Sequence, residues 1–332
     1  MKSVNCPLCE GKSELFVEKR TSSFRGEDFE VFEYYYSCKN CKEKFTTSEI
    51  DNININYLYN QYREKYSIPF PQQLTAVRER YNLSAAKMSE ILGLDANQYR
   101  LYENGEMPSS STATLLSLIM NPLDFKEIIQ RKKEILKNSK RILDDLIDLI
   151  LQNKAREKEL KQILFDSFII PNRFTGFTVP NYEKFANMVL YFIPNASMKT
   201  RLNKLLFYAD FSSCKYTGYS ISGCKYIALP MGSVPCDYGL IFGLLESENY
   251  LTNEFVIIKE KETEKIVPLK SFNPNLFNSS ELNILETVLK KFKSLSTPEI
   301  IKIAHDEKAW LDNVKNKAII DFTIYAPQLS AL

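Results

Sequence analysis

The cysteines are the residues of this chain best suited to chemistry, and four of the seven are spaced as metal ligands. They form two Cys-x-x-Cys pairs, Cys6/Cys9 and Cys38/Cys41. Each pair can direct two thiolates at one ion, and two pairs complete a tetrahedral four-cysteine site. Four protein ligands leave no open coordination position, so we expect one structural zinc ion per chain. Redox-active or coincidental pairs are the alternative interpretation.

The remaining candidates for chemistry show no comparable pattern. Cys214, Cys224 and Cys236 lack ligand spacing, and His305 is the only histidine. A single histidine excludes catalysis by a histidine pair. Isolated cysteines are more often small buried hydrophobes than nucleophiles. The sequence therefore predicts a protein that is not an enzyme; a hydrolase using these cysteines is the alternative from the enzyme class.

Composition places the chain among ordinary globular proteins. It has 332 residues, 44% hydrophobic and 25% charged, with a net charge of +2. This length suits two or three domains. Such a small net charge gives no global basic field, so a surface for DNA must be local. No apolar stretch approaches the length of a membrane span, and Met1-Lys2-Ser3 begins no signal region. We expect a cytoplasmic protein with no membrane partner.

Strands must position the cysteine pairs in residues 1–50. Glu14 to Lys19 and Phe29 to Ser37 are rich in β-branched and aromatic residues, and Arg25 to Asp28 can form the hairpin tip between them. A segment of this size and polarity has little core, so the metal is expected to hold it folded.

Residues 51–122 are predicted to contain a linker helix followed by four short helices. The signals that start or stop these four are Pro71, Ser84, Gly93, Asp95, Gly105 and either Ser109 or Ser111. The second and third are separated by a Gly-Leu-Asp turn, which is the helix-turn-helix pattern.

The third helix of this set is the candidate recognition helix. Tyr99 and Tyr102 would face the core, whereas Asn97 and Arg100 would share the exposed face. Asparagine suits adenine, and arginine suits guanine or phosphate. The candidate DNA-binding residues are Asn97, Gln98, Arg100 and Leu101. The alternative is a packing unit that makes no DNA contact.

This stretch resembles the Xre/Cro-type DNA-binding domain, and more closely that of MqsA-type antitoxins. The matching residues are Leu83-Ser84, Leu92-Gly93-Leu94, Asn97, Tyr102-Glu103-Asn104-Gly105 and Pro108-Ser109. Ala85 and Leu101 depart from the pattern, since a glutamine and an arginine are usual there. The cysteine layout also resembles the N-terminal domain of MqsA-type antitoxins, with Lys42 where a glycine often stands. The resemblance implies operator binding, but not a particular operator sequence.

Residues 123–180 are predicted to form a helical connector that ends in a loop from Pro171 to Pro180. Isoleucine or leucine recurs every seven residues at Ile128, Ile135, Ile142 and Leu149. The stripe fits either a coiled-coil dimer seam or a helix packed on its own chain.

The last segment, residues 181–332, resembles the Panacea domain of toxin-neutralising antitoxins. The matching residues are Thr200 to Asp210, Tyr216-Thr217-Gly218, Ile221-Ser222-Gly223, Tyr226-Ile227-Ala228, Gly232-Ser233-Val234-Pro235, His305-Asp306-Glu307 and Trp310. Ser233 departs from the usual Gly-Pro-Val-Pro. We expect a mostly helical domain with an amphipathic helix over residues 201–211.

The Panacea resemblance implies a protein partner, the cognate toxin. Candidate toxin-binding residues are Lys204, Tyr208, Asp210, Tyr216, Tyr226 and Tyr238. Tyrosines are frequent anchors of interfaces, although each of these could instead be core. Lys204, Asp210, Tyr226 and His305 could alternatively form a polar network that fixes the fold.

Together these features predict a multidomain protein, mainly α with small β elements (α+β). It would be the antitoxin of a type II toxin–antitoxin system. Its C-terminal domain would bind the toxin, and its helix-turn-helix would repress its own operon, as a homodimer reading paired half-sites. The alternative is a ligand-sensing repressor of the Xre family that has no toxin partner.

Overall fold

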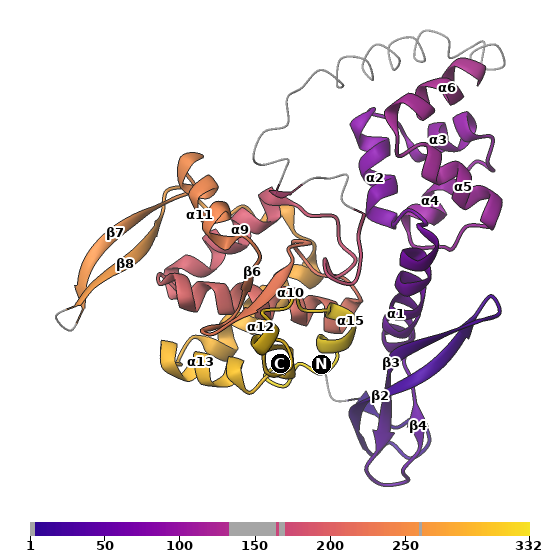
Figure 1. Ribbon diagram of the computed structural model, residues 1–332. Helices are drawn as coiled ribbons and strands as arrows, with labels where there is room; N and C mark the ends of the chain where they lie inside the picture. The colour runs from indigo at the N-terminus through magenta and orange to yellow at the C-terminus, as the bar shows by residue number, and fades with distance from the viewer. Residues whose placement is uncertain (1–3, 133–163, 166–169, 259–260) are drawn as a thin grey trace. The chain divides into compact units, whose positions relative to one another are not determined.

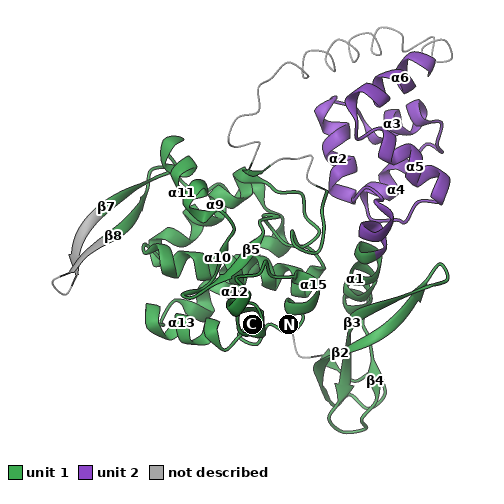
Figure 2. Cartoon of the chain, viewed as in Figure 1, with its two compact units in different colours: residues 1–61, 160–332 green, residues 62–159 purple. Residues whose placement is uncertain are grey.

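The computed structural model describes residues 4–132, 164–165, 170–258 and 261–332. The chain divides into two compact units (Figure 2). Unit 1 contains residues 1–61 and 160–332, and unit 2 contains residues 62–159. Helices and small antiparallel sheets make up both the N- and C-terminal parts of unit 1 (Figure 1), which confirms the predicted α+β class. None of the described helices is long and apolar enough to cross a membrane.

A four-stranded antiparallel sheet carries the cysteine pairs. Its strands are β1 (Val4–Asn5), β2 (Lys12–Phe24), β3 (Glu27–Cys38) and β4 (Lys44–Phe45), in that order across the sheet. The predicted β2–β3 hairpin is confirmed and is longer than expected. Its tip is Arg25-Gly26, where φ is +52° and +81°. Two positive φ values match the twist of paired strands in a two-residue hairpin.

Helix α1 (Ser48–Tyr66) begins three residues earlier than the predicted linker segment. Ile50, Ile53 and Tyr57 pack against Tyr34 and Tyr36 of β3. The first half of α1 is therefore part of the fold that carries the cysteines.

The described part of unit 2, residues 62–132, is a bundle of five short helices besides the end of α1. They are α2 (Pro71–Arg80), α3 (Ala85–Leu92), α4 (Gln98–Glu103), α5 (Ser110–Leu118) and α6 (Pro122–Lys132). Ser84 and Ser109 cap α3 and α5 by accepting a backbone N–H, and Gly93 ends α3 in the left-handed region. These sequence signals act as expected.

Helix α6 belongs to the bundle core, although its sequence was assigned to the connector. Phe125 and Ile129 are buried with Leu116 and Met88 in one cluster. The seven-residue pattern that continues to Ile135, Ile142 and Leu149 lies outside the described residues.

The C-terminal domain (residues 170–332) consists of helices with two short hairpins. Its helices are α9 (Tyr182–Phe192), α10 (Lys199–Thr217), α11 (Tyr238–Ser247), α12 (Ser279–Phe292), α13 (Thr297–His305), α14 (Lys308–Leu311) and α15 (Phe322–Tyr325). The hairpins pair β5 (Tyr226–Leu229) with β6 (Gly232–Pro235), and β7 (Leu251–Ile258) with β8 (Lys261–Pro268). Three 3-10 turns complete it, at Ile193–Asn195, Pro274–Leu276 and Val314–Asn316.

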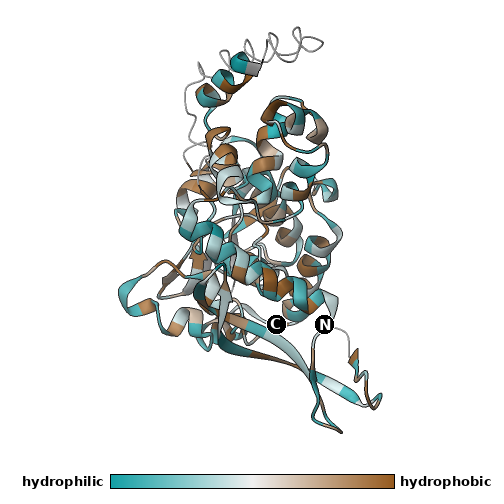
Figure 3. Cartoon of the chain, turned by 90° about the vertical axis from the view of Figure 1, so that its right-hand side faces the viewer, coloured by the Kyte–Doolittle hydropathy of each residue, from teal (hydrophilic) through white to brown (hydrophobic). Residues whose placement is uncertain are grey.

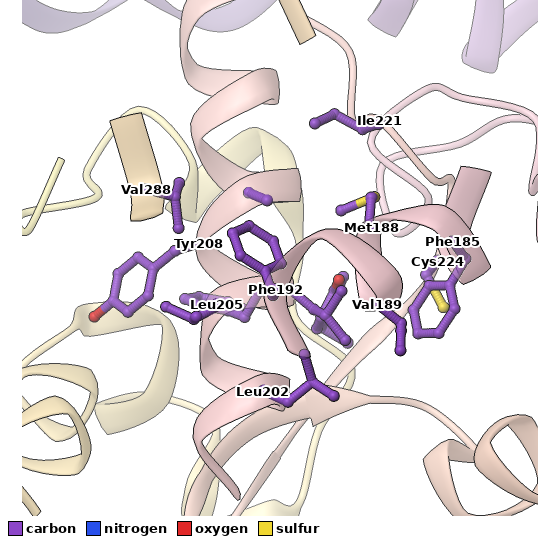
Figure 4. Close-up of a cluster of buried hydrophobic side chains, with 14 of the residues drawn as sticks. Phe185, Met188, Val189, Phe192, Leu202, Leu205, Tyr208, Ile221, Cys224 and Val288 are labelled. Carbon is purple, nitrogen blue, oxygen red and sulfur yellow. The ribbon is translucent and has the colours of Figure 1, made fainter. Parts of the chain in front are cut away.

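Helix α10 is the centre of the C-terminal domain. Every residue from Leu202 to Cys214 is buried, which corrects the expected amphipathic helix. Figure 4 shows the packing around it: Leu202, Leu205 and Tyr208 of α10 lie in one cluster with side chains of α9 and α12. Apolar residues (brown) and polar residues (teal) are interspersed along the helices of the chain in Figure 3. On α10 both apolar and polar side chains are buried inside the C-terminal domain.

The C-terminal end of α10 is capped by side chains of α1. The last carbonyls of a helix have no partner within the helix. Asn56 Nδ2 donates to Thr217 O at 2.9 Å, and Asn60 Nδ2 donates to Gly218 O at 3.1 Å. Tyr57 donates its hydroxyl to Cys214 O at 2.9 Å in a buried position. Within unit 1, α1 thus joins the N-terminal sheet to the central helix.

The Tyr57→Phe variant tests this junction. It removes one buried hydrogen bond and keeps the ring, while Cys214 O keeps Gly218 N as a donor, so we expect a loss of about 0.5–1.5 kcal/mol in the free energy of unfolding. Urea denaturation of the full chain measures it. The matched control is Tyr66→Phe, since Tyr66 is 44% exposed. Equal free energies of unfolding for the two variants would show that the Tyr57 hydrogen bond does not stabilise the contact between α1 and α10.

Candidate functional site

The four N-terminal cysteines converge on one point. The Sγ–Sγ distances are 3.6 Å for Cys6–Cys41, 3.4 Å for Cys9–Cys38 and 3.5 Å for Cys9–Cys41. All four sulfur atoms lie within 4.8 Å of one another. A tetrahedral ion with metal–sulfur bonds of about 2.3 Å would separate its ligands by about 3.8 Å. The donor set and its spacing therefore fit a single four-coordinate metal ion.

Backbone amides support the thiolate form of these ligands. Leu8 N donates to Cys6 Sγ and Asn40 N donates to Cys38 Sγ, each at 3.4 Å. Burial raises the pKa of Cys38, but hydrogen bonds that include the amides of Cys41 and Asn40 outweigh it and bring this pKa to about 6. The amide of Glu43 lowers the pKa of Cys41, but hydrogen bonds with the neighbouring cysteine thiols outweigh it and raise this pKa to about 12. A metal ion requires deprotonated cysteine, so these amides favour binding.

The two cysteine turns have the same backbone geometry. Glu10 N donates to Cys6 O at 2.9 Å, and Lys42 N donates to Cys38 O at 3.1 Å. Glu10 and Lys42 both adopt the left-handed region, with φ of +58° and +63°. Glycine adopts this conformation most readily, which explains why a glycine is usual at this position. Lys42 adopts the same conformation here, so the turn is kept.

The predicted recognition helix, α4, presents its candidate residues as expected. Asn97, Arg100 and Leu101 are exposed. Gln98 is half-buried, and its side-chain amide donates to Glu106 Oε1 at 3.2 Å. Tyr99 and Tyr102 are buried, which confirms their predicted core role.

The start of α4 differs from the prediction. Asp95 does not cap the helix; it begins a turn in which Gln98 N donates to Asp95 O at 2.9 Å. Asn97 occupies the N-cap position, but its side chain makes no capping hydrogen bond. The amide of Asn97 therefore projects from the first turn instead of being used by the helix itself.

Two contacts that sequence reasoning missed hold α4 in place. Arg78 Nε of α2 lies 2.6 Å from Glu103 Oε1, and both side chains are largely buried. The glutamate raises the pKa of Arg78 through this bond. Arg63 Nη2 donates to Gly105 O at 2.6 Å, next to the end of α4. The partners are 25 residues apart in the first contact and 42 in the second, so no short-range sequence pattern predicts either of them.

Four of the six candidate toxin-binding residues are not on the surface, which corrects that expectation. Lys204, Tyr208, Asp210 and Tyr226 are fully buried, because three of them lie on α10 and the fourth on β5 beside it. Tyr216 is half-buried and Tyr238 is exposed, so these two keep their candidacy.

Of the four residues expected in a polar network, Asp210 and Tyr226 are hydrogen-bonded to each other, whereas Lys204 bonds Ser233 O and His305 stacks on Trp310. Asp210 Oδ1 accepts the backbone amides of Ile221 and Ser222, both at 2.8 Å. Its Oδ2 accepts the hydroxyls of Ser222 at 2.6 Å and Tyr226 at 2.7 Å. Burial raises the pKa of Asp210, and these four bonds oppose that shift. The network anchors residues 221–226 to the central helix.

Lys204 is a buried cation on the same helix. Its Nζ donates to Ser233 O at 3.0 Å, and burial lowers its pKa to about 7. Gly232 has a φ of +106°, and a Cβ there would lie 2.6 Å from Lys204 Nζ. Only glycine suits both the turn and the lysine beneath it.

The C-terminal cysteines do not form a reactive site. Burial raises the pKa of Cys214 and Cys224, and it raises that of Cys236 to about 11. The reactive form of cysteine is the thiolate, so these thiols are poorly suited to nucleophilic catalysis at neutral pH. His305 stacks on Trp310 with ring centroids 3.9 Å apart.

The Asp210→Asn variant tests the network. The new amide would turn an NH2 group toward hydrogen-bond donors, so we expect a loss of at least about 2–3 kcal/mol in unfolding free energy. Thermal denaturation followed by circular dichroism measures it. The exposed Asp312→Asn is the control, and comparable stability of both variants would refute the role of the network.

Comparison with known families supports the resemblance in the C-terminal domain. Residues 202–311, about a third of the chain, match the family model of the antitoxin SocA-like, Panacea domain. The match runs from α10 to α14 and includes the Asp210 network and Lys204. A search of curated proteins found no match. The chain thus carries a domain related to an antitoxin family, and that family is not an enzyme family.

Proposed function

We propose that this protein is the antitoxin of a type II toxin–antitoxin system. The observation that carries the proposal is the match of residues 202–311 to the SocA-like Panacea antitoxin domain. In this proposal the C-terminal domain binds a cognate toxin protein and blocks it by direct contact. The thiols of this domain, whose pKa values burial raises, agree with a binding role.

We further propose that unit 2 represses the operon of the pair. The support is the exposed Asn97 and Arg100 at the start of α4, which the buried Arg78–Glu103 ion pair holds in place. Domains of this type read paired half-sites, so the protein would act as a homodimer on operator DNA.

Zinc is the proposed ion of the four-cysteine site. Four thiolates at tetrahedral spacing favour it, and the closed ligand set gives it a structural role. In unit 1 the ion would hold the sheet on which α1 packs, and α1 caps α10.

The second candidate function is ligand sensing. A cavity of about 230 Å³ in the C-terminal domain is lined by residues that include Cys224, Cys236 and Asp237. Sites for small molecules usually have about 300–1,000 Å³, so the cavity suits only a very small ligand. A ligand found there after soaking would favour this function over the antitoxin.

Metal analysis tests the zinc proposal. We expect native mass spectrometry to show one zinc per chain, lost in Cys9→Ala and retained in Cys236→Ala. Binding in zinc-finger peptides is worth about 10–16 kcal/mol, so a strong chelator should unfold the N-terminal sheet. A folded N-terminal sheet in a metal-free protein would refute the structural role.

The Asn97→Ala variant tests DNA recognition. We expect it to lose about 1–3 kcal/mol at one base position and to relax specificity there. Fluorescence anisotropy with the DNA upstream of the protein's own gene, at two salt concentrations, measures the effect. Arg100→Ala should weaken binding as well. Wild-type affinity in both variants would show that α4 does not read the operator.

Co-expression with the adjacent gene tests the antitoxin role. The product of that gene should stop growth when made alone, and the full chain should restore growth. Asn97→Ala should still restore growth, because its DNA contact is separate from neutralisation. A toxic neighbour that this chain fails to neutralise would contradict the proposal.

A further inference from the structure

The outer side of β5 carries the half-buried side chains of Ile227 and Leu229, and exposed apolar side chains lie in the segments next to it. Residues 318–320 run beside β5: Ile319 pairs with Ile227, and Ile320 N donates to Tyr226 O at 2.8 Å. Residues directly opposite each other share one face, so Ile227 and Ile319 lie together. Ile319 is 42% exposed, whereas Tyr226 on the opposite face is buried.

Two neighbouring elements extend this surface. Met231, in the turn between β5 and β6, is 57% exposed, and Leu311 of α14 is 53% exposed. Helix α14 packs against both strands. We call Ile227, Leu229, Met231, Leu311 and Ile319 the β5 surface. Exposed apolar side chains gathered in one place mark interaction sites more often than scattered ones do.

The frame under the β5 surface is rigid. Trp310 donates its indole N–H to Leu229 O at 2.8 Å, and the His305 ring stacks on the indole. Lys204 Nζ holds the other strand through Ser233 O. A surface fixed before binding loses little conformational entropy when a partner docks.

The Lys204 amine beneath this surface has no charged partner among the described residues. Within the described part of the chain, Lys204 forms no ion pair, and its Nζ hydrogen bond goes to a neutral carbonyl. The amine lies directly beneath Gly232, one residue from the exposed Met231. His305 Nε2 is also buried, with no hydrogen-bond partner in the described structure. Burial lowers the pKa of Lys204 to about 7, and a negative charge above the turn would stabilise the protonated form of this amine.

We propose that the β5 surface is where the toxin docks, with apolar side chains around a carboxylate that faces Lys204 across the β5–β6 turn. This inference rests on the proposed antitoxin function and specifies its contact site. The carboxylate would supply the negative charge that the C-terminal domain itself does not place beside Lys204. Lys204 stays buried in this arrangement and acts through the field above the turn.

Substitutions of exposed residues in the full-length chain test the docking site. The probe is the toxic product of the adjacent gene, and the readouts are growth rescue and affinity by isothermal titration. Met231→Asp and Leu311→Asp should each weaken binding at least about tenfold, because both put a charge in an apolar contact. Met231→Leu should bind normally. Leu269→Asp is the matched control, since Leu269 is 52% exposed and follows β8.

The Lys204→Met variant tests the charge. It removes the ammonium and keeps an unbranched apolar chain. We expect weaker binding by about tenfold and a smaller dependence of affinity on salt. Thermal stability should also fall, because Ser233 O loses its donor. A lysine that acts only through Ser233 O would leave the salt dependence of binding unchanged, which would overturn the charge pairing.

The outcomes separate the two levels of the proposal. If the wild-type chain does not bind the adjacent gene product, the antitoxin function and the docking site both fail. If the wild type binds and both aspartate variants bind equally well, only the docking site fails. Loss of binding in Tyr238→Asp alone would move the contact to α11 and overturn the β5 surface.

Discussion

Burial of polar groups on α10 is the constraint on which the C-terminal domain depends. A buried carboxylate or ammonium is costly unless hydrogen bonds satisfy it. Asp210 fixes residues 221–226 through four hydrogen bonds, and Lys204 fixes the β5–β6 turn through Ser233. The loops around the helix are thus specified by the polar atoms that they must satisfy, and the apolar cluster fills the remaining space.

The need to satisfy buried polar groups also links α10 to the N-terminal part of unit 1. Asn56 and Asn60 of α1 donate to Thr217 O and Gly218 O at the end of α10, and Tyr57 adds a second hydrogen bond to Cys214 O, which also accepts Gly218 N. A fragment containing only residues 181–332 would leave these carbonyls without α1. The zinc site, in our proposal, therefore supports toxin binding indirectly by stabilising the sheet on which α1 rests.

Local features of the structure could be predicted, whereas long-range ones could not. Ser84, Ser109 and Gly93 act over three or four residues. The two Cys-x-x-Cys pairs are recognisable by their spacing alone, so the helix caps and the clustering of these cysteines could be predicted. The expected amphipathic helix over residues 201–211 implied one exposed face, so the complete burial of α10 was not predicted, and a polar network of Lys204 and Asp210 was only the alternative. Their partners lie 11 to 29 residues away, and only the fold brings them near. The Arg78–Glu103 pair was missed for the same reason.

Hydrogen–deuterium exchange of the full chain, with and without the adjacent gene product, tests the central claim most directly. That claim is that the C-terminal domain contacts the toxin. It predicts slower exchange in residues 226–235 and 305–319 of the complex, with no change in residues 97–101. Slower exchange confined to residues 4–50, or no change anywhere in a complex that forms, would contradict it.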